Sequence, residues 1–163
     1  MAKRESKINI FNYKKYPPQV KKIKEKKLVH FYNSNFPLSS WSNEYFNSFL
    51  NDENKRKMEC FILKRNKKII GFILGRKVGN IRFRYNLTTL LVDKRFRGKG
   101  YSKLLLNEFL KNVKKNKSVQ KVYLHFRDSN NFKEFYKHCG FRGHRIAGTY
   151  SNGEKKHFME IKL

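Results

Sequence analysis

The feature that most constrains this chain is an apolar run that ends in a glycine-rich turn and passes at once into a helical pattern. The run ends at Val92, an R-x-x-G-x-G turn follows with Gly98 and Gly100, and apolar residues then recur at helical spacing over residues 102–116. Glycines allow a tight turn in which successive N–H groups point into one concave space. The positive end of the helix dipole lies behind those donors. The segment therefore predicts a strand, a phosphate-binding turn and a helix, in that order.

A second pattern begins at Asn130, thirty residues after Gly100. Asn130 precedes a short helical segment that carries Tyr136 and ends at Gly140-Phe141. Together, and in this order, the two patterns resemble those of the GNAT superfamily of acetyl-CoA-dependent N-acetyltransferases. The resemblance implies an α/β (α+β) fold with a mixed central sheet of about seven strands, flanked by helices. It further implies that two strands splay into a V that holds acetyl-CoA as cosubstrate, without a metal.

The hydrophobic periodicity predicts one domain over residues 1–163, with no linker or internal repeat. A helix should follow Pro17-Pro18 and bury Val20, Ile23, Leu28 and Phe31. The other expected helices are residues 42–51, 102–116 (burying Leu105, Phe109 and Val113) and 131–138. The expected strands are residues 8–11, 59–64, 68–78, 82–92, 121–126, 142–150 and 155–163.

The net charge is extreme, because 39 Lys and Arg residues outweigh 12 Asp and Glu residues to give +27. One reading is affinity for a polyanion such as ribosomal RNA, and the other is a solvated basic surface. Either reading argues against a polycationic small molecule as substrate. No apolar run reaches the length of a membrane span, no secretory signal is visible, and the two cysteines lack metal or disulfide spacing. These features predict a cytoplasmic location.

Three further stretches resemble the N-terminal protein acetyltransferases, in particular the NatE (San-type) catalytic subunit. They are Phe36-Pro37-Leu38 with Trp41, the strand end Val122–Asn130 with its Y-L-H and S-N letters, and Tyr150 in the closing hairpin. The resemblance implies a peptide N-terminus as substrate and an auxiliary subunit or a ribosome as a partner. It assigns substrate binding to Phe36, Leu38, Trp41, Asn86 and Tyr150.

The resemblance also assigns the cofactor contacts. Backbone groups of Leu90, Leu91 and Val92 should bind the pantetheine arm, which Asn130 should also bind unless it caps the following helix. Tyr136 should protonate or hydrogen-bond the sulfur of coenzyme A, if it is not simply a core aromatic residue. The turn that should hold the diphosphate consists of Arg95, Phe96, Arg97, Gly98, Lys99, Gly100 and Tyr101.

His125 is the candidate general base, since imidazole titrates near neutral pH and the L-H-x-x-x-S-N context matches the family. The family shares this role with a tyrosine on the strand before the glycine turn. Counting back from Gly100 places Arg84 there, with Tyr85 next to it. Neighbouring residues of a strand face opposite ways, so Tyr85 takes the role only if a bulge shifts the register.

The residues favour an α-amine as acceptor. Its pKa lies about 2.5 units below that of a lysine side chain, so a modest base is sufficient. A lysine ε-amine calls for a well-placed carboxylate, and no carboxylate is evident on the central strands. The prediction is therefore acetyl transfer to a protein or peptide N-terminus, Met-starting ones included. The alternatives are a lysine or small-amine N-acetyltransferase and a catalytically silent subunit that binds acetyl-CoA or RNA.

Overall fold

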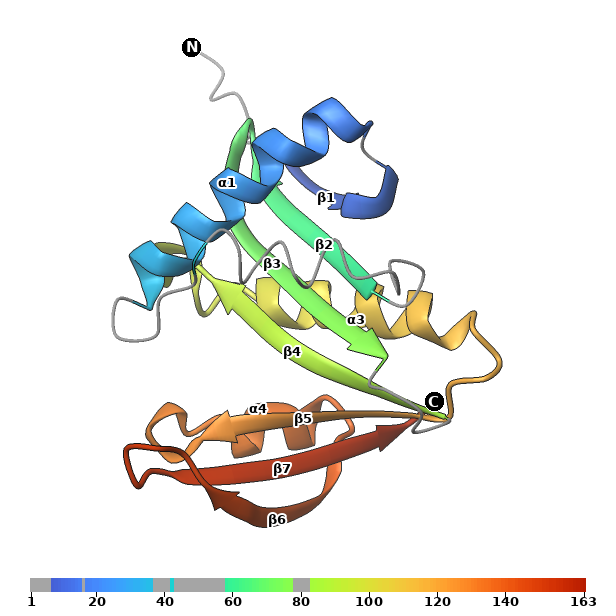
Figure 1. The fold of residues 1–163 in the computed structure, drawn as a ribbon, viewed down its shortest axis with the longest axis vertical. Helices are drawn as coiled ribbons and strands as arrows, with labels where there is room; N and C mark the ends of the chain where they lie inside the picture. The colour runs from blue at the N-terminus through green and yellow to red at the C-terminus, as the bar shows by residue number, and fades with distance from the viewer. Residues whose placement is uncertain (1–6, 16, 37–41, 43–57, 78–82) are drawn as a thin grey trace. The chain divides into compact units, whose positions relative to one another are not determined.

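The computed structural model describes residues 7–15, 17–36, 42, 58–77 and 83–163. Seven strands form one sheet in the order β1-β2-β3-β4-β5-β7-β6 (Figure 1). The sheet is mixed, because β4 and β5 run parallel while β1–β2, β5–β7 and β6–β7 are antiparallel. The strands are β1 (Ile8–Asn12), β2 (Met58–Arg65), β3 (Lys68–Lys77), β4 (Arg84–Val92), β5 (Lys121–Arg127), β6 (Arg142–Thr149) and β7 (Lys155–Lys162), and the helices of the described part are α1 (Pro18–Asn35), α3 (Tyr101–Lys114) and α4 (Lys133–His138). The predicted α+β class with a seven-stranded mixed sheet is confirmed.

The chain divides into two compact units, and β3 and β4 each contribute to both. The first unit comprises Met1–Leu74 and Thr89–Phe109, and the second comprises Gly75–Thr88 and Leu110–Leu163. The glycine turn lies in the first unit, whereas His125 and Tyr136 lie in the second.

In the first unit, α1 and α3 cover opposite faces of the strands (Figure 1). The α1 face is filled by side chains that are almost fully buried, among them Leu28, Tyr32, Ile62 and Phe72. On the α3 face a Cβ added to Gly71 would come within 2.8 Å of the Leu91 carbonyl oxygen and 3.3 Å of Leu105 Cδ1. Because both faces are covered, β2 and β3 read as nearly continuous apolar runs instead of alternating ones.

In the second unit, β5 alternates strictly between its two faces. Val122, Leu124 and Phe126 are buried, and Phe126 packs against Tyr136 of α4 with ring centroids 5.8 Å apart. The intervening residues of the strand, His125 among them, face the other way. The α4 helix ends in a Schellman motif: Gly140 adopts φ 94°, and the Phe141 N–H donates to the Tyr136 carbonyl at 3.0 Å. This ending fixes the helix that carries Tyr136.

Most predicted elements are confirmed with small shifts of their ends. Helix α4 begins two residues later than expected because Asn131 adopts a left-handed conformation with φ 47°. The chain reaches β4 through Phe83, whose φ is 77°. The expected helix 42–51, apart from Ser42, lies outside the described residues, as do the side chains of Val20 and Ile23. Leu28, Leu105, Phe109 and Val113 are buried as predicted, and Phe31 is partly buried against the core.

None of the helices in the described residues is both long enough and apolar enough to cross a membrane. Within the same residues, no cluster of three or more His, Cys, Asp or Glu side chains could hold a metal ion.

Candidate functional site

The glycine turn is held by a carboxylate at the end of β4. Asp93 is buried and caps the short 3₁₀ helix Lys94–Phe96, accepting a hydrogen bond of 2.9 Å from the Arg95 N–H. The Arg95 guanidinium donates two more, of 3.1 and 2.6 Å, to the same carboxylate. These bonds hold the pKa of Asp93 below its ordinary value, so the anchor stays ionised. Arg97 donates from Nε to the Val92 carbonyl at 3.0 Å, which fixes the other side of the turn.

Beyond this anchor the turn presents a row of unused backbone donors. Gly98 and Gly100 adopt φ 74° and 77°, and no described atom lies within 4 Å of the place where a Cβ would stand on either. Within the described residues, the N–H groups from Gly98 to Ser102 take part in no backbone–backbone hydrogen bond. The first turn of the 14-residue helix α3 carries no acidic side chain to neutralise its dipole. Such a helix start is suited to an anion.

Cations surround the turn in the same unit. The Phe96 ring has the Arg65, Lys99 and Arg95 cations 5.5, 5.7 and 5.9 Å from its centroid. Arg65 escaped the sequence analysis because it lies on β2, about thirty residues earlier in the chain. Open amides, a helix start and clustered cations together fit a diphosphate such as that of coenzyme A. Of the predicted pantetheine residues, Leu91 and Val92 are buried and Leu90 is half-buried, and Tyr101 opens α3.

The second half of the predicted site is the sheet face that carries His125, here called the His125 face. The register places Phe158 of β7 directly opposite His125, and Arg145 of β6 directly opposite Phe158. The rings of Tyr123 and Phe158 lie 5.8 and 5.6 Å from the imidazole. The β4–β5 ladder has four pairs and ends at Leu87 and Leu124. A ladder that stops early is what two strands splayed into a V would require. Around His125, β5 therefore has an edge that is not paired with β4.

His125 is suited to act as a base. Its side chain is exposed and forms no hydrogen bond within the described residues. Partial burial of the ring, with the nearby cations Lys156 and Arg145, lowers the pKa of His125 below the ordinary value of 6.5. The imidazole is therefore neutral at physiological pH and free to accept a proton.

The other histidines with described contacts are engaged in local structure. The rings of His144 and His157 hydrogen-bond each other at 2.8 Å, and His157 Nε2 lies 2.7 Å from Asp128 Oδ1. His138 Nδ1 donates to the Glu134 carbonyl at 2.7 Å. These partners fix the rings in place, which supports His125 as the candidate base.

Tyr136 lies on the opposite side of β5 from His125. Its ring is 7 % exposed among Phe126, Phe135 and Phe141, and burial raises the pKa of its hydroxyl, so the group stays protonated. No hydrogen bond to that hydroxyl is found within the described residues, where every fully buried side-chain N or O atom has a partner. The ring has the packing role that the sequence left open as one of two readings, and its hydroxyl keeps the proton that a proton donor would need.

The structure corrects the placement of Tyr85. The ladder pairs Arg84–Leu87 with Lys121–Leu124 without a bulge, so Tyr85 lies opposite Val122 on the buried face. Arg84 and Asn86 lie on the His125 face instead. Tyr85 and His125 are therefore not brought together.

Tyr123 is the tyrosine that does accompany His125, and the sequence analysis did not assign it. Its hydroxyl is hydrogen-bonded by Asn86, whose Oδ1 accepts from Thr88 Oγ1 at 2.9 Å. This hydrogen bond favours the ionised phenol and so lowers the pKa of Tyr123. Burial nevertheless raises the pKa of Tyr123 above its ordinary value. The signal in the sequence was the alternation Tyr123-Leu124-His125, which puts both side chains on one face.

The remaining predicted residues have mixed outcomes. Asn130 ends the 3₁₀ helix Asp128–Asn130 and does not cap α4, whose N-cap, Phe132, makes no side-chain capping bond. Phe36 packs on Tyr32, with ring centroids 5.1 Å apart, at the end of α1. Tyr150 lies under the Arg127 guanidinium, 4.0 Å from its ring centroid. Leu38 and Trp41 lie outside the described residues.

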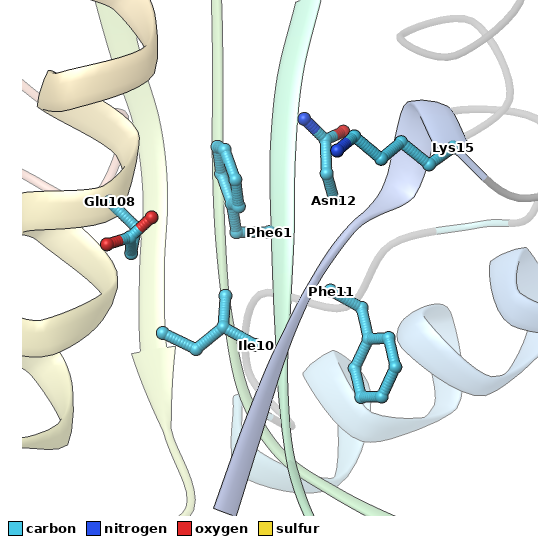
Figure 2. A pocket seen from close by; sticks show the side chains of 6 residues that line it. All are labelled: Ile10, Phe11, Asn12, Lys15, Phe61 and Glu108. Carbon is cyan, nitrogen blue, oxygen red and sulfur yellow. The ribbon is translucent and has the colours of Figure 1, made fainter.

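A separate hollow of about 400 Å³ lies in the first unit between β1, β2 and α3 (Figure 2). Ile10 and Phe61 point toward Glu108 of α3, whereas Phe11 points to the other side of β1. No residue of the glycine turn lines this hollow. It is therefore no part of the predicted cofactor site.

Comparison with known proteins agrees with this arrangement. Residues 26–141 match the acetyltransferase (GNAT) family. Over 113 residues, which are 69% of this chain and 72% of the relative, the chain is 29% identical to the [ribosomal protein bS18]-alanine N-acetyltransferase of Haemophilus influenzae.

Two solved structures show the same fold. Arabidopsis thaliana NAA60 in complex with acetyl-CoA has a TM-score of 0.75 and 20% identity, with 96% of this chain and 99% of that chain covered. The NatC complex bound to Gag peptide and CoA gives 0.72 and 20%, with 95% and 99% covered. The glycine turn, the strand order and the family match lead to one conclusion: the chain belongs to the acetyltransferase (GNAT) family and is an N-acetyltransferase that uses acetyl-CoA.

Proposed function

We propose that the chain acetylates the free α-amine of protein or peptide N-termini, Met-starting ones among them. The observation that carries this proposal is the kind of base on the His125 face. His125 is free there, whereas the two nearby carboxylates are engaged: Glu160 pairs with Lys121 at 2.6 Å, and Glu154 pairs with Arg127 at 2.9 Å. An imidazole suits an α-amine, whose pKa lies about 2.5 units below that of lysine. A lysine acceptor would call for a free carboxylate.

Acetyl-CoA supplies an activated acetyl thioester, and the chain's own groups bind it and move protons. The open amides from Gly98 to Ser102, with the cations around Phe96, would hold the diphosphate. His125 would take the proton that the α-amine loses, directly or through a water. Tyr123 would orient that water through its hydroxyl, which can donate or accept a hydrogen bond. Tyr136 would give a proton to the departing sulfur from the other side of β5.

The relatives support an N-terminal acceptor and a larger assembly. The Haemophilus influenzae relative is named for an alanine of a ribosomal protein, and the NatC structure is a complex with a bound peptide. By analogy, this chain would act on N-termini, with ribosome contact or an auxiliary subunit as partners. A cytoplasmic location fits that role.

Two matched peptides test the proposal. One has a free N-terminus and no lysine, and the other has a blocked N-terminus and one internal lysine. Acetyl incorporation from acetyl-CoA should occur on the first peptide and be at least about tenfold slower on the second. Equal rates, or a faster second peptide, would favour the lysine or small-amine alternative.

A further inference from the structure

The His125 face carries more positive than negative charge in the part of the chain that the structure describes, although Glu160 on this face also feels the charge of Arg145. Arg145 and Lys156 lower the pKa of His125 by their charge, and neither lies within ion-pair distance of a described carboxylate. The carboxylates closest to them along the strands, Glu160 and Glu154, already have the cationic partners Lys121 and Arg127. The face therefore has an excess of cations beside the candidate base.

Arg145 is held in a defined position. A register shift in the β6–β7 ladder separates Arg142 from Arg145, and Gly143 within it adopts φ 67°. After the shift Arg145 pairs with Phe158, and its guanidinium lies 3.8 Å from the centroid of that ring. Stacking on the ring leaves the N–H donors at the edge of the guanidinium free for a carboxylate. Lys156 lies on the same face of β7, two residues from Phe158, with Nζ 5.2 Å from the Tyr150 ring centroid.

The spacing suits a peptide. Arg145 and His125 lie on strands separated by β7, which puts their backbones about 10 Å apart. The Arg145 guanidinium lies over Phe158 on the intervening strand, so its charge is closer to the imidazole than the backbones are. An extended peptide advances about 3.3 Å per residue, so its second and third residues lie about 3 and about 7 Å beyond the first. With its α-amine at His125, an acceptor would bring the side chain of its second or third residue close to Arg145.

The cations would also act on the acceptor's amine. A positive field lowers the pKa of a nearby ammonium group, which raises the fraction of neutral nucleophile at pH 7. The same field repels an acceptor whose second or third residue is Lys or Arg. An acidic side chain at those positions would offset the repulsion of the incoming amine.

We propose that the His125 face selects N-termini with Asp or Glu at the second or third residue, and that Arg145 and Lys156 bind that carboxylate. This inference rests on the proposed N-terminal acetylation and names its substrate class.

The test compares three peptides that start with Met and differ only at residues two and three. Both of these residues are acidic in the first peptide, neutral in the second and basic in the third. At saturating acetyl-CoA and low salt, kcat/KM should rank acidic above neutral above basic, with about a tenfold step between the first two. The preference should shrink as salt is raised, since the charges on this face are exposed to solvent.

Variants locate the effect. Arg145→Gln and Lys156→Gln should each lower kcat/KM for the acidic peptide about fivefold more than for the neutral peptide. Arg145→Glu should move the preference toward the basic peptide. The matched control is Lys155→Gln, which removes the same charge from the neighbouring exposed residue on the opposite face of β7 and should keep the ranking. The urea midpoint of each variant reports whether the enzyme is folded.

The outcomes separate the two proposals. Equal kcat/KM for the three peptides, or a preference for the basic one, would overturn the acidic preference and leave N-terminal acetylation standing. An acidic preference that persists unchanged in Arg145→Gln and Lys156→Gln would overturn the assignment to these residues. Acetylation of lysine or small amines without any N-terminal product would overturn both proposals.

Discussion

At the scale of single residues, the glycine turn works through backbone conformation and open space. No described atom lies near the place where a Cβ would stand on Gly98, so a side chain there would meet no steric clash with them. The constraint is the positive φ of 74°, together with the space that a bound diphosphate would fill.

Gly98→Ala should therefore weaken acetyl-CoA binding at least about tenfold, while the strain of a positive φ costs only about 1 kcal/mol of stability. Isothermal titration and urea unfolding measure the two quantities. Gly153→Ala is the control, since Gly153 has φ 82° and equally open surroundings in the β6–β7 turn. It should lose similar stability and keep its affinity. Equal affinities of the two variants would contradict a cofactor role for the turn.

His125 gives a prediction about pH. Its pKa is lowered from 6.5, so the base stays neutral, and active, until the pH falls below that value. Between the pKa of His125 and about pH 8, kcat/KM for a peptide should rise about tenfold per pH unit, because the α-amine of the peptide deprotonates. Below the pKa of His125 the slope on a logarithmic plot should steepen from one toward two.

His125→Gln should keep the slope of one throughout and lose about a hundredfold in rate. His144→Gln is the matched control, because His144 lies on the other face in contact with His157 and its pKa is also lowered. That variant should keep the steepening. A wild-type profile whose slope does not steepen at low pH would count against His125 as the base. So would a slope that still steepens in His125→Gln.

At the scale of the elements, the close approach of β3 and β4 depends on Gly71. A Cβ there would lie 2.8 Å from the Leu91 carbonyl oxygen, and a backbone atom cannot move aside cheaply. Gly71→Ala should lower the free energy of unfolding by about 2 kcal/mol. Urea unfolding checks this value, and an unchanged midpoint would show that the strands separate without cost.

The β6–β7 hairpin is tied back to the end of β5 by Glu154. Its carboxylate accepts hydrogen bonds from the Ser129 hydroxyl, the Ser129 N–H and the Arg127 guanidinium, which lower the pKa of Glu154 to about 2. Because the pKa of Glu154 is lower in the folded state, its ionised carboxylate stabilises the fold at pH values above the unfolded-state pKa of about 4.3. This stabilisation is lost as the pH falls toward 2.

Urea midpoints of the wild type and Glu154→Gln should therefore differ most at pH 6. The difference should shrink steadily from pH 4 to pH 3, a window that lies between the two pKa values of Glu154. A difference that is constant across this range would mean that the carboxylate charge is not what stabilises the hairpin.

Several elements could be predicted from the sequence because their signals are local. Apolar runs and alternation marked the strands, and Pro17-Pro18 marked the start of α1. The end of α4 was marked by Gly140, whose positive φ the helix ending requires. The start of α4 was misplaced by two residues, since the left-handed conformation of Asn131 has no strong sequence signal.

The site was predicted less completely, because its contacts join distant strands. Period-two counting gave the common face of Tyr123 and His125, but not the hydrogen bond from Asn86, which lies 37 residues from Tyr123. It could not place Arg145 beside Phe158 either, because the irregular β6–β7 ladder shifts the register. The location of Arg65 beside Phe96 depends equally on packing between segments.

At the scale of the whole molecule, the net charge of +27 predicts salt-dependent binding to polyanions. Affinity for a structured RNA fragment should fall at least about a hundredfold between 50 and 200 mM salt if several phosphates are contacted. Fluorescence anisotropy across a salt series gives the slope. No binding at low salt, or a flat response, would identify the charge as a solvated surface only.

The central claim is that the acceptor is an N-terminal α-amine, and product mapping tests it most directly. The purified chain would be incubated with acetyl-CoA and a library of peptides with free N-termini, some with internal lysines, and fragment masses would locate each acetyl group. The account predicts acetyl groups on the N-termini, Met-starting ones among them, and none on internal lysines. Acetyl groups on lysines alone, or none on any peptide despite acetyl-CoA binding, would contradict it.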